Sequence, residues 1–301
     1  MKMNKKLKGN LYLLLATLIW GSAFVSQSIG MDYIGPFTFQ AVRCTLATFG
    51  LLVVIFFFDK ANGRSFRKGW CDRQLWVGGI LCAVPLFLAV NLQQLGIVST
   101  GAGKSAFLTA MYIVMVPILG LFMKRRISPM VPISVVLAVI GLYLLSCAGE
   151  SGISIGDILL LLCALMFAIQ ILFVDRFAPT VDALRLNCLQ SAFCAIGSGI
   201  IMVFSEEVRL PNLLDCWLPL CHTGFLSMGA AYSLQIMGQK HVESSTASLI
   251  MSLESAFALL FGWLILKETL TIPEGIGCIL VFVAVILSQL PVKIRKTSLS
   301  N

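Results

Sequence analysis

Residues 9–20 read GNLYLLLATLIW and residues 156–167 read GDILLLLCALMF, so one apolar pattern occurs twice at an offset of 147 (156 − 9). Each stretch opens a run of about 20 residues with few charges, the length of a helix that crosses a bilayer. The pattern predicts two membrane helices at equivalent places in two halves of the chain. The first run is longer than the apolar region of a signal peptide, and we expect it to be retained.

The chain as a whole has the composition of a membrane protein. Of its 301 residues, 58% are hydrophobic and 12% are charged, against roughly 25% charged residues in a soluble domain. A soluble surface needs more charge, and a disordered chain needs lower hydrophobicity. In lipid, only helices and closed barrels satisfy the backbone, and the alternation of barrel strands is absent. We predict an all-α polytopic membrane protein with ten transmembrane helices, at residues 9–30, 36–58, 75–97, 100–123, 128–147, 155–175, 184–204, 217–238, 244–266 and 271–290.

The lysines and arginines are distributed unevenly over the connections between these segments. If the N-terminus is inside, the inside connections hold 17 of the 22 basic residues, and the outside connections hold only Arg209 and Lys267. An excess of basic residues marks the cytoplasmic side. We therefore predict a multi-pass protein of the inner or plasma membrane with both termini in the cytoplasm. Membrane orientation then accounts for the net charge of +8, and we expect no nucleic-acid partner. The 17 residues are Lys2, Lys5, Lys6, Lys8, Lys60, Arg64, Arg67, Lys68, Arg73, Lys124, Arg125, Arg126, Arg176, Lys240, Lys293, Arg295 and Lys296.

A second repeat joins other parts of the two halves. LQQLGIVST from residue 92 resembles SLQIMGQKH from residue 233, which aligns Gln93 with Gln235 at an offset of 142 (235 − 93). The same offset aligns Gly120 with Gly262. The chain thus divides into two five-helix repeats, at residues 9–147 and 155–290. Because five is odd, the second repeat enters the membrane inverted, an arrangement typical of secondary transporters with a substrate site near the midplane.

Four further stretches carry a resemblance to a known family. IWGSAF at 19–24, QAVRCTLA around Arg43, SAFLTAMYIVMVPIL at 105–119 and SLESAFALLFGWLILKETLT at 252–271 resemble the EamA type of the drug/metabolite transporter superfamily. Ser255 stands where that family usually has a proline. The resemblance covers nearly the whole chain and implies a ten-helix secondary transporter that moves small organic metabolites, such as amino acids or related amines, by alternating access. We expect an exporter; the alternative is a membrane-embedded sensor or interaction protein without transport.

Four ionisable side chains fall inside the apolar segments. A charge at the bilayer centre costs at least about 2.5–3.5 kcal/mol, so each must face the bundle interior, water or a partner. Glu254 lies near the middle of its segment, where it either binds a proton or an ammonium group or ties helices together. Arg43 is interpreted first as a positioning residue. Lys104 either attracts an anionic group or extends to the surface, and Arg185 can reach the inner surface.

Glu254 and Lys104 occupy the ninth and fourth segments, which are equivalent in the two repeats. We therefore expect both in one central cavity, where their opposite charges suit a zwitterion, with protons as a possible coupling ion. Other polar and aromatic side chains are candidates for the same lining. The candidate substrate-binding residues are Glu254, Lys104, Arg43, Trp20, Asn91, Gln94, Tyr112, Tyr232 and Gln235.

Enzyme, metal and cofactor chemistry is not indicated. The ten cysteines lie mostly in apolar runs without a CxxC pair, and there are two histidines. TGAGKS at 100–105 lacks the first glycine of a phosphate-binding loop and the strand that precedes one. No HExxH sequence or nucleophile constellation occurs. We expect no enzyme activity, no cofactor and no metal; the partners are the lipid bilayer and a small-molecule substrate.

Overall fold

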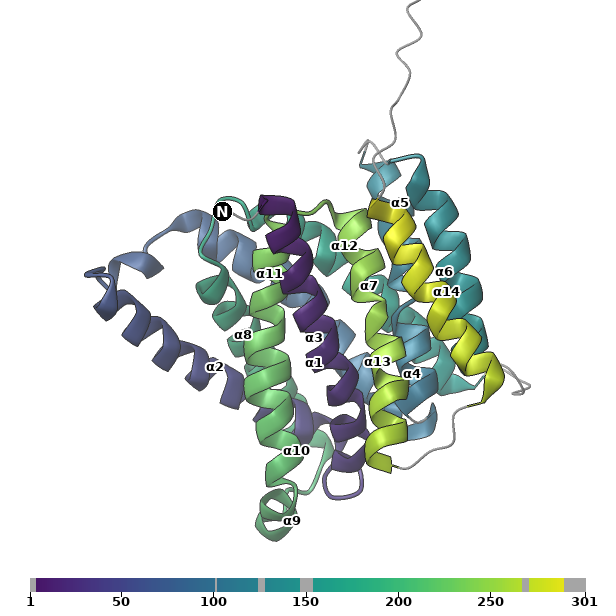
Figure 1. The fold of residues 1–301 in the computed structure, drawn as a ribbon. Coiled ribbons are helices and arrows are strands. Elements are labelled where there is room, and N and C mark those ends of the chain that lie inside the picture. Colours follow the sequence, from purple (N-terminus) through teal and green to yellow (C-terminus); the bar gives the residue numbers. More distant parts are fainter. Residues whose placement is uncertain (1–3, 101, 124–127, 147–153, 267–270, 290–301) are drawn as a thin grey trace, which may run out of the picture.

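Helices run through every part of the chain that the computed structural model describes, namely residues 4–100, 102–123, 128–146, 154–266 and 271–289. No β-strand occurs among these residues, and the helices form one bundle (Figure 1). The basic residues at 2, 124–126, 267, 293, 295 and 296, and the predicted repeat ends at 147 and 290, lie outside the described residues. The all-helical part of the prediction is confirmed.

The N-terminal half forms its helices over the predicted segments. Asn4 accepts a hydrogen bond from the backbone N–H of Lys6 and so caps the first helix. Pro36 occupies the first turn of the second helix, where its missing N–H is harmless. The elements are α1 (Lys5–Gly30), α2 (Pro36–Ala61), the short η1 (Lys68–Trp70), α3 (Arg73–Thr100), α4 (Ala102–Thr109), α5 (Tyr112–Phe122) and α6 (Met130–Ser146).

The C-terminal half begins with a capping box. The Ser154 hydroxyl accepts from the N–H of Asp157, and the Asp157 carboxylate accepts from the N–H of Ser154. The elements are α7 (Ile155–Phe177), α8 (Ala183–Ser205), α9 (Leu210–Asp215), α10 (Trp217–Cys221), the π-helical η2 (His222–Ala231), α11 (Tyr232–Gln239), α12 (Ser244–Met251), α13 (Leu253–Phe261), η3 (Gly262–Leu266) and α14 (Ile272–Gln289).

Seven helical stretches in the described chain are long and apolar enough to cross a membrane. Two shorter apolar helices lie within α6 and α14. Large apolar side chains point outward from the long helices, with Phe57 of α2 62% and Ile196 of α8 66% exposed. Such an apolar surface requires lipid rather than water around it. The molecule is a polytopic membrane protein.

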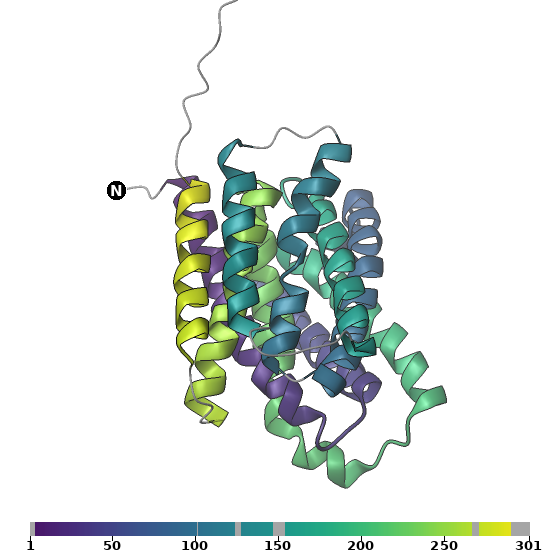
Figure 2. The ribbon, with the colours of Figure 1, turned by 90° about the vertical axis from the view of Figure 1, so that its right-hand side faces the viewer.

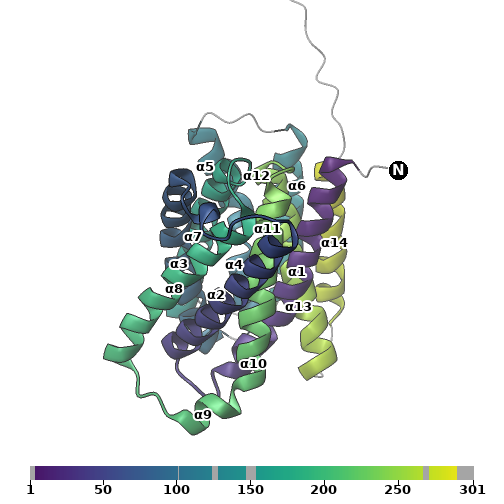
Figure 3. The same ribbon diagram turned by 90° about the vertical axis from the view of Figure 1, so that its left-hand side faces the viewer.

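Pairs of helices that are distant in sequence hold the bundle together. α3 packs along α7, α2 along α8, and α6 along α14, while α1 contacts α11 and α13 (Figures 2 and 3). α1 and α11 cross at two glycines, because a Cβ on either Gly9 or Gly238 would lie 3.0 Å from the carbonyl oxygen of the other. Small residues at such crossings let helices in lipid approach closely.

The antiparallel pair α2 and α8 is joined at both of its ends. At one end, Asp59 of α2 forms a buried ion pair with Arg185 in the first turn of α8. At the other end, Glu206, which follows α8, accepts from the N–H of Phe37 (2.9 Å) and from the N–H (2.8 Å) and hydroxyl (2.6 Å) of Thr38 in α2. Glu206 thus satisfies N–H groups in the first turn of α2, and Asp59 pairs with a side chain in the first turn of α8.

The described ends of the chain lie at one end of the bundle. The start of α1 and the last turn of α14 are at the top of Figure 1, on the same side as the connection from α2 to α3, whereas α9 is at the bottom. This arrangement places the basic residues near η1 and near the start of α1 on one face of the bundle.

Candidate functional site

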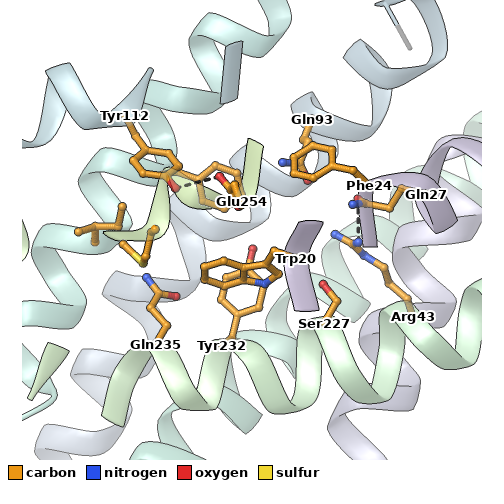
Figure 4. A pocket seen from close by; sticks show the side chains of 13 residues that line it. Trp20, Phe24, Gln27, Arg43, Gln93, Tyr112, Ser227, Tyr232, Gln235 and Glu254 are labelled. Carbon is orange, nitrogen blue, oxygen red and sulfur yellow. Dashed lines mark hydrogen bonds between the residues drawn. The ribbon is translucent and has the colours of Figure 1, made fainter. Parts of the chain in front are cut away.

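A buried cavity lies at the centre of the bundle, between helices from both halves of the chain (Figure 4). The volume open to the centre of a water molecule is about 30 Å³, which suits a water or two. A larger molecule requires the lining side chains to move apart. The lining residues are Trp20, Phe24, Gln27, Arg43, Gln93, Tyr112, Phe167, Ile171, Ser227, Tyr232, Gln235, Met251 and Glu254.

Glu254 lies at one end of this cavity and is held by Tyr112. The Tyr112 hydroxyl donates to Glu254 Oε1 over 2.8 Å, and both residues are buried. Tyr112 directly follows one tightened turn within its membrane helix, and Glu254 lies within another: the N–H of Met111 bonds to the carbonyl of Leu108, and the N–H of Ser255 to that of Ser252. Tightened turns within helices often mark functional hinges, and these two turn a phenol and a carboxyl toward each other.

Arg43 lies at the other end and is held by amide oxygens. Its Nε donates to Gln40 Oε1 (2.7 Å) and its Nη1 to Gln27 Oε1 (2.8 Å). Within the described chain no carboxylate forms an ion pair with Arg43, although its exposed fraction is 2%. Among the described residues, the Arg43 charge therefore has no carboxylate within ion-pair distance.

Aromatic rings separate the two ends. The rings of Trp20 and Tyr232 meet edge to face with centroids 5.0 Å apart, and those of Tyr112 and Phe167 with centroids 6.5 Å apart. Ser227 reaches the lining from the π-helical η2, which also contains Met228 and Gly229. The side-chain amide of Asn187 donates to the carbonyls of Met228 and Gly229 over 2.9 Å. The cavity thus has polar ends and a largely apolar middle.

Six of the nine predicted site residues line the cavity: Glu254, Arg43, Trp20, Tyr112, Tyr232 and Gln235. Asn91 instead bonds to Ser198 Oγ over 2.9 Å. Gln94 lies behind the lining, where it donates to the Gln27 carbonyl and accepts from the Gln40 amide, each over 3.3 Å. These two residues belong to the packing around the cavity.

Lys104 lies apart from the cavity. Its Nζ is 3.2 Å from Asp157 Oδ2, at the start of α7. The structure therefore does not bring Lys104 and Glu254 together as the sequence analysis expected. The reason is that the first turn of α4 packs against α7, where Asp157 offers a nearer carboxylate. Asp157, in the first turn of its segment, was not considered as a partner.

Several lining residues were not identified from the sequence. Phe167 and Ile171 occupy the places in α7 that Trp20 and Phe24 occupy in α1, at the offset of 147 that the first repeat gives (20 + 147 and 24 + 147). The repeat offsets therefore carried a usable signal. Ser227 and Met251 had no such signal. Among the described residues, no group of three or more His, Cys, Asp or Glu side chains could hold a metal ion.

A bundle of apolar helices around a buried cavity with ionisable ends defines a multi-pass membrane protein. The chain belongs to the EamA-like transporter family, whose model matches residues 7–147 and again residues 154–290. The protein is therefore a membrane transporter, located in the cell membrane, that binds small substrates. The family resemblance stated from the sequence is confirmed.

Relatives with the same assignment cover most of the chain. An uncharacterized transporter of Archaeoglobus fulgidus is 34% identical over a 297-residue alignment, and the match covers 96% of this chain and 88% of that protein. The uncharacterized transporter YoaV of Bacillus subtilis is 23% identical and covers 93% of this chain and 96% of its own. A solved crystal structure superposes with a TM-score of 0.78 over 93% of this chain and 96% of the other, at 16% identity, which shows a shared fold.

Proposed function

We propose that this protein is a secondary transporter that exports small organic metabolites, with amino acids or related amines as candidates, by alternating access. The observation that supports this most is the cavity itself, which holds a carboxyl and an arginine inside the membrane-spanning bundle. Ionisable groups at that depth are costly to bury and commonly serve substrates or ions. Glu254 is the candidate group for an ammonium or for a coupling proton.

The proposed architecture is ten transmembrane helices in two inverted repeats, at 9–147 and 155–290. Four pairs of lining residues support it, because the offsets of the sequence repeats relate them. The offset of 147 relates Trp20 to Phe167 and Phe24 to Ile171, and the offset of 142 relates Gln93 to Gln235 and Tyr112 to Glu254. A cavity lined by equivalent residues is expected at the axis between two inverted halves.

Helix contacts support the same architecture. The proposed repeat exchanges α1 with α7 and α3 with α11, and both α1–α11 and α3–α7 are in contact. The repeat also relates one end of the α2–α8 pair to the other. Thr38 and Arg185 are 147 positions apart in the sequence, and so are Asp59 and Glu206. Both acids join α2 to α8, one at each end of the pair.

We place both termini in the cytoplasm because the basic residues gather at the end of the bundle where α1 begins. The surroundings of His241 in the loop before α12 reflect that charge: burial, and then Lys240, Lys5 and Lys8, lower the pKa of its imidazole. A reporter active only in the cytosol should work when fused after Lys68 or at Asn301 and should fail after Glu150 or Glu207. Activity at either of the last two sites contradicts this orientation.

Flux into proteoliposomes tests transport. Amino acids and their amines should accumulate against a gradient when a pH difference is imposed, and Glu254→Gln should abolish this flux while the protein still folds. Glu207→Gln is the matched control, because Glu207 is 90% exposed at the opposite end from the basic residues. If Glu254→Gln shows the same flux as the wild type across the pH range, Glu254 has a structural role and no role in transport. Substrate binding without flux favours the sensor alternative.

A further inference from the structure

We propose that the cavity binds its ligand in one fixed orientation, with an anionic group on Arg43 and an ammonium group between Glu254 and Gln235. This inference rests on the proposed function, because it names the ligand chemistry of the same cavity. It replaces Lys104 by Arg43 as the group that binds the anionic end.

The anionic end follows from how Arg43 is held. Gln27 and Gln40 accept two of its five N–H groups. Amide oxygens orient a guanidinium without cancelling its charge, so the remaining donors favour a carboxylate or a similar anion. Gln40 is itself fixed, since its Nε2 donates to the carbonyl of Val90 over 2.6 Å. The fork of Arg43 is therefore oriented before any ligand arrives.

The ammonium end follows from the orientation of the Gln235 side chain. Its Nε2 donates to Gln170 Oε1 (3.1 Å) and to Gln239 Oε1 (3.0 Å), while Gln239 Nε2 donates to the carbonyl of Ile171. These bonds use both amide hydrogens of Gln235. Its Oε1 is buried at the cavity and has no donor among the described residues. An unsatisfied buried acceptor in the same cavity as the Glu254 carboxyl is a place for an N–H group.

The middle of the cavity adds one more polar atom. The indole Nε1–H of Trp20 is buried without an acceptor in the part of the chain that the structure describes, and Trp20 stands between Glu254 and Arg43 in Figure 4. A ligand oxygen would satisfy this donor. The cavity thus offers donors at Arg43 and Trp20 and acceptors at Glu254 and Gln235. A zwitterion can pair with both sets in only one orientation.

This polarity predicts a strong preference for molecules that carry both charges. A pure amine leaves Arg43 unpaired, and a pure acid leaves the Glu254 end unpaired. Sites built to pair polar groups reject analogues that lack one of them by large factors. We expect an amino acid to bind about 100-fold more tightly than the amine that lacks its carboxylate or the acid that lacks its ammonium group.

The experiment measures binding to the full chain in nanodiscs through the rise in its unfolding temperature with ligand concentration. The probes are matched sets: leucine with 3-methylbutylamine and 4-methylpentanoate, and alanine with ethylamine and propanoate. Binding of at least one amino acid without its two analogues is the expected result. Equal binding of an amine or an acid, or no binding by any probe, overturns the proposal.

Variants assign the two ends. Arg43→Gln should weaken amino acid binding to the level of the amine and leave amine binding unchanged, and Arg43→Lys should restore part of the loss. Gln235→Met removes the acceptor and keeps a side chain of similar size. It should weaken binding of the amino acid and of the amine but not binding of the acid. Arg176→Gln, at an exposed arginine outside the cavity, is the charge-matched control. An amino acid that binds Arg43→Gln as tightly as the wild type contradicts the orientation.

Binding is read separately from flux, so the two proposals can fail separately. Selective binding of an amino acid without flux supports the proposed ligand orientation and contradicts the proposed transport. If an amino acid is transported and neither Arg43→Gln nor Gln235→Met changes its flux, the result supports transport and contradicts the proposed orientation.

Discussion

Two buried arginines in this protein differ in the groups that hold them. Arg185 lies between Asp59 and Asp182, with its guanidinium 5.6 Å from the ring centre of Trp70. Arg43 lies 5.9 Å from the ring centre of Phe39, but its hydrogen bonds go to glutamine oxygens. Carboxylates cancel the charge of Arg185 and make it part of the helix packing. Amides leave the charge of Arg43 available to a ligand.

Lys104 belongs with Arg185 in this comparison. Both cations are paired with a carboxylate, Lys104 with Asp157 and Arg185 with Asp59, and each pair joins the two halves of the chain. Arg43 is different because its nearest polar partners are neutral. A buried cation is therefore a guide to function only when its counter-charge is missing from the protein.

Breaking the Arg185 pair should have the largest effect on stability. Asp59→Ala leaves a buried cation with only the partly exposed Asp182, and loss of one partner of a buried ion pair costs about 3 kcal/mol. The free energy of unfolding in mild detergent measures the loss. The double variant Asp59→Leu with Arg185→Leu should recover most of it. Wild-type stability in Asp59→Ala contradicts the structural role.

A crowded glycine beside Arg185 gives a smaller effect of the same kind. A Cβ on Gly69 would lie 2.3 Å from the guanidinium carbon of Arg185, so Gly69→Ala must displace the guanidinium from Asp59. We expect a loss of about 1–2 kcal/mol in unfolding free energy, as for other overpacked sites. Gly103→Ala is the control, because a Cβ there meets nothing within 4 Å. An equal loss in both variants attributes the effect to something other than Arg185.

Removal of the Arg43 charge should affect folding less than either change near Arg185. Arg43→Gln removes an uncompensated charge and keeps a donor for Gln27, so about 1 kcal/mol of hydrogen bonding is at stake. Unfolding free energy and ligand affinity, measured on the same sample, separate the two roles. A loss of about 3 kcal/mol or more in stability would place Arg43 beside Arg185 as a structural residue.

The smallest effect is expected at Lys104. Its side chain is 15% exposed, and partly solvated ion pairs contribute about 0.2–1 kcal/mol. Lys104→Ala should change the unfolding free energy by that amount. Ligand affinity should change by less than about twofold, or about 0.4 kcal/mol, because Lys104 does not line the cavity. An affinity loss comparable to that of Arg43→Gln would return Lys104 to the cavity, as the sequence analysis expected.

The candidate site could be predicted in part because depth within a membrane helix is a local property. Glu254 and Arg43 stood out as charges inside apolar segments, and Trp20, Tyr112, Tyr232 and Gln235 as polar or aromatic residues in them. The interior location of Asn91 and Gln94 was also foreseen, since both are buried. The direction of their side chains could not be predicted. Successive residues point about 100° apart around a helix, so a small difference in helix rotation decides whether a side chain faces the cavity or the packing behind it.

The sequence by itself determined where the long apolar helices lie and that they require a membrane, while the short η1 and α9 fall outside the predicted segments. Both follow from local causes: a backbone in lipid must bond within its own segment, and the apolar runs specify where. Only the tertiary structure decided which charges meet. Tyr112 and Glu254 are 142 positions apart, and Arg185 and Asp59 are 126 apart. Their pairing depends on which helices adjoin and how each is rotated, and packing between distant segments sets both.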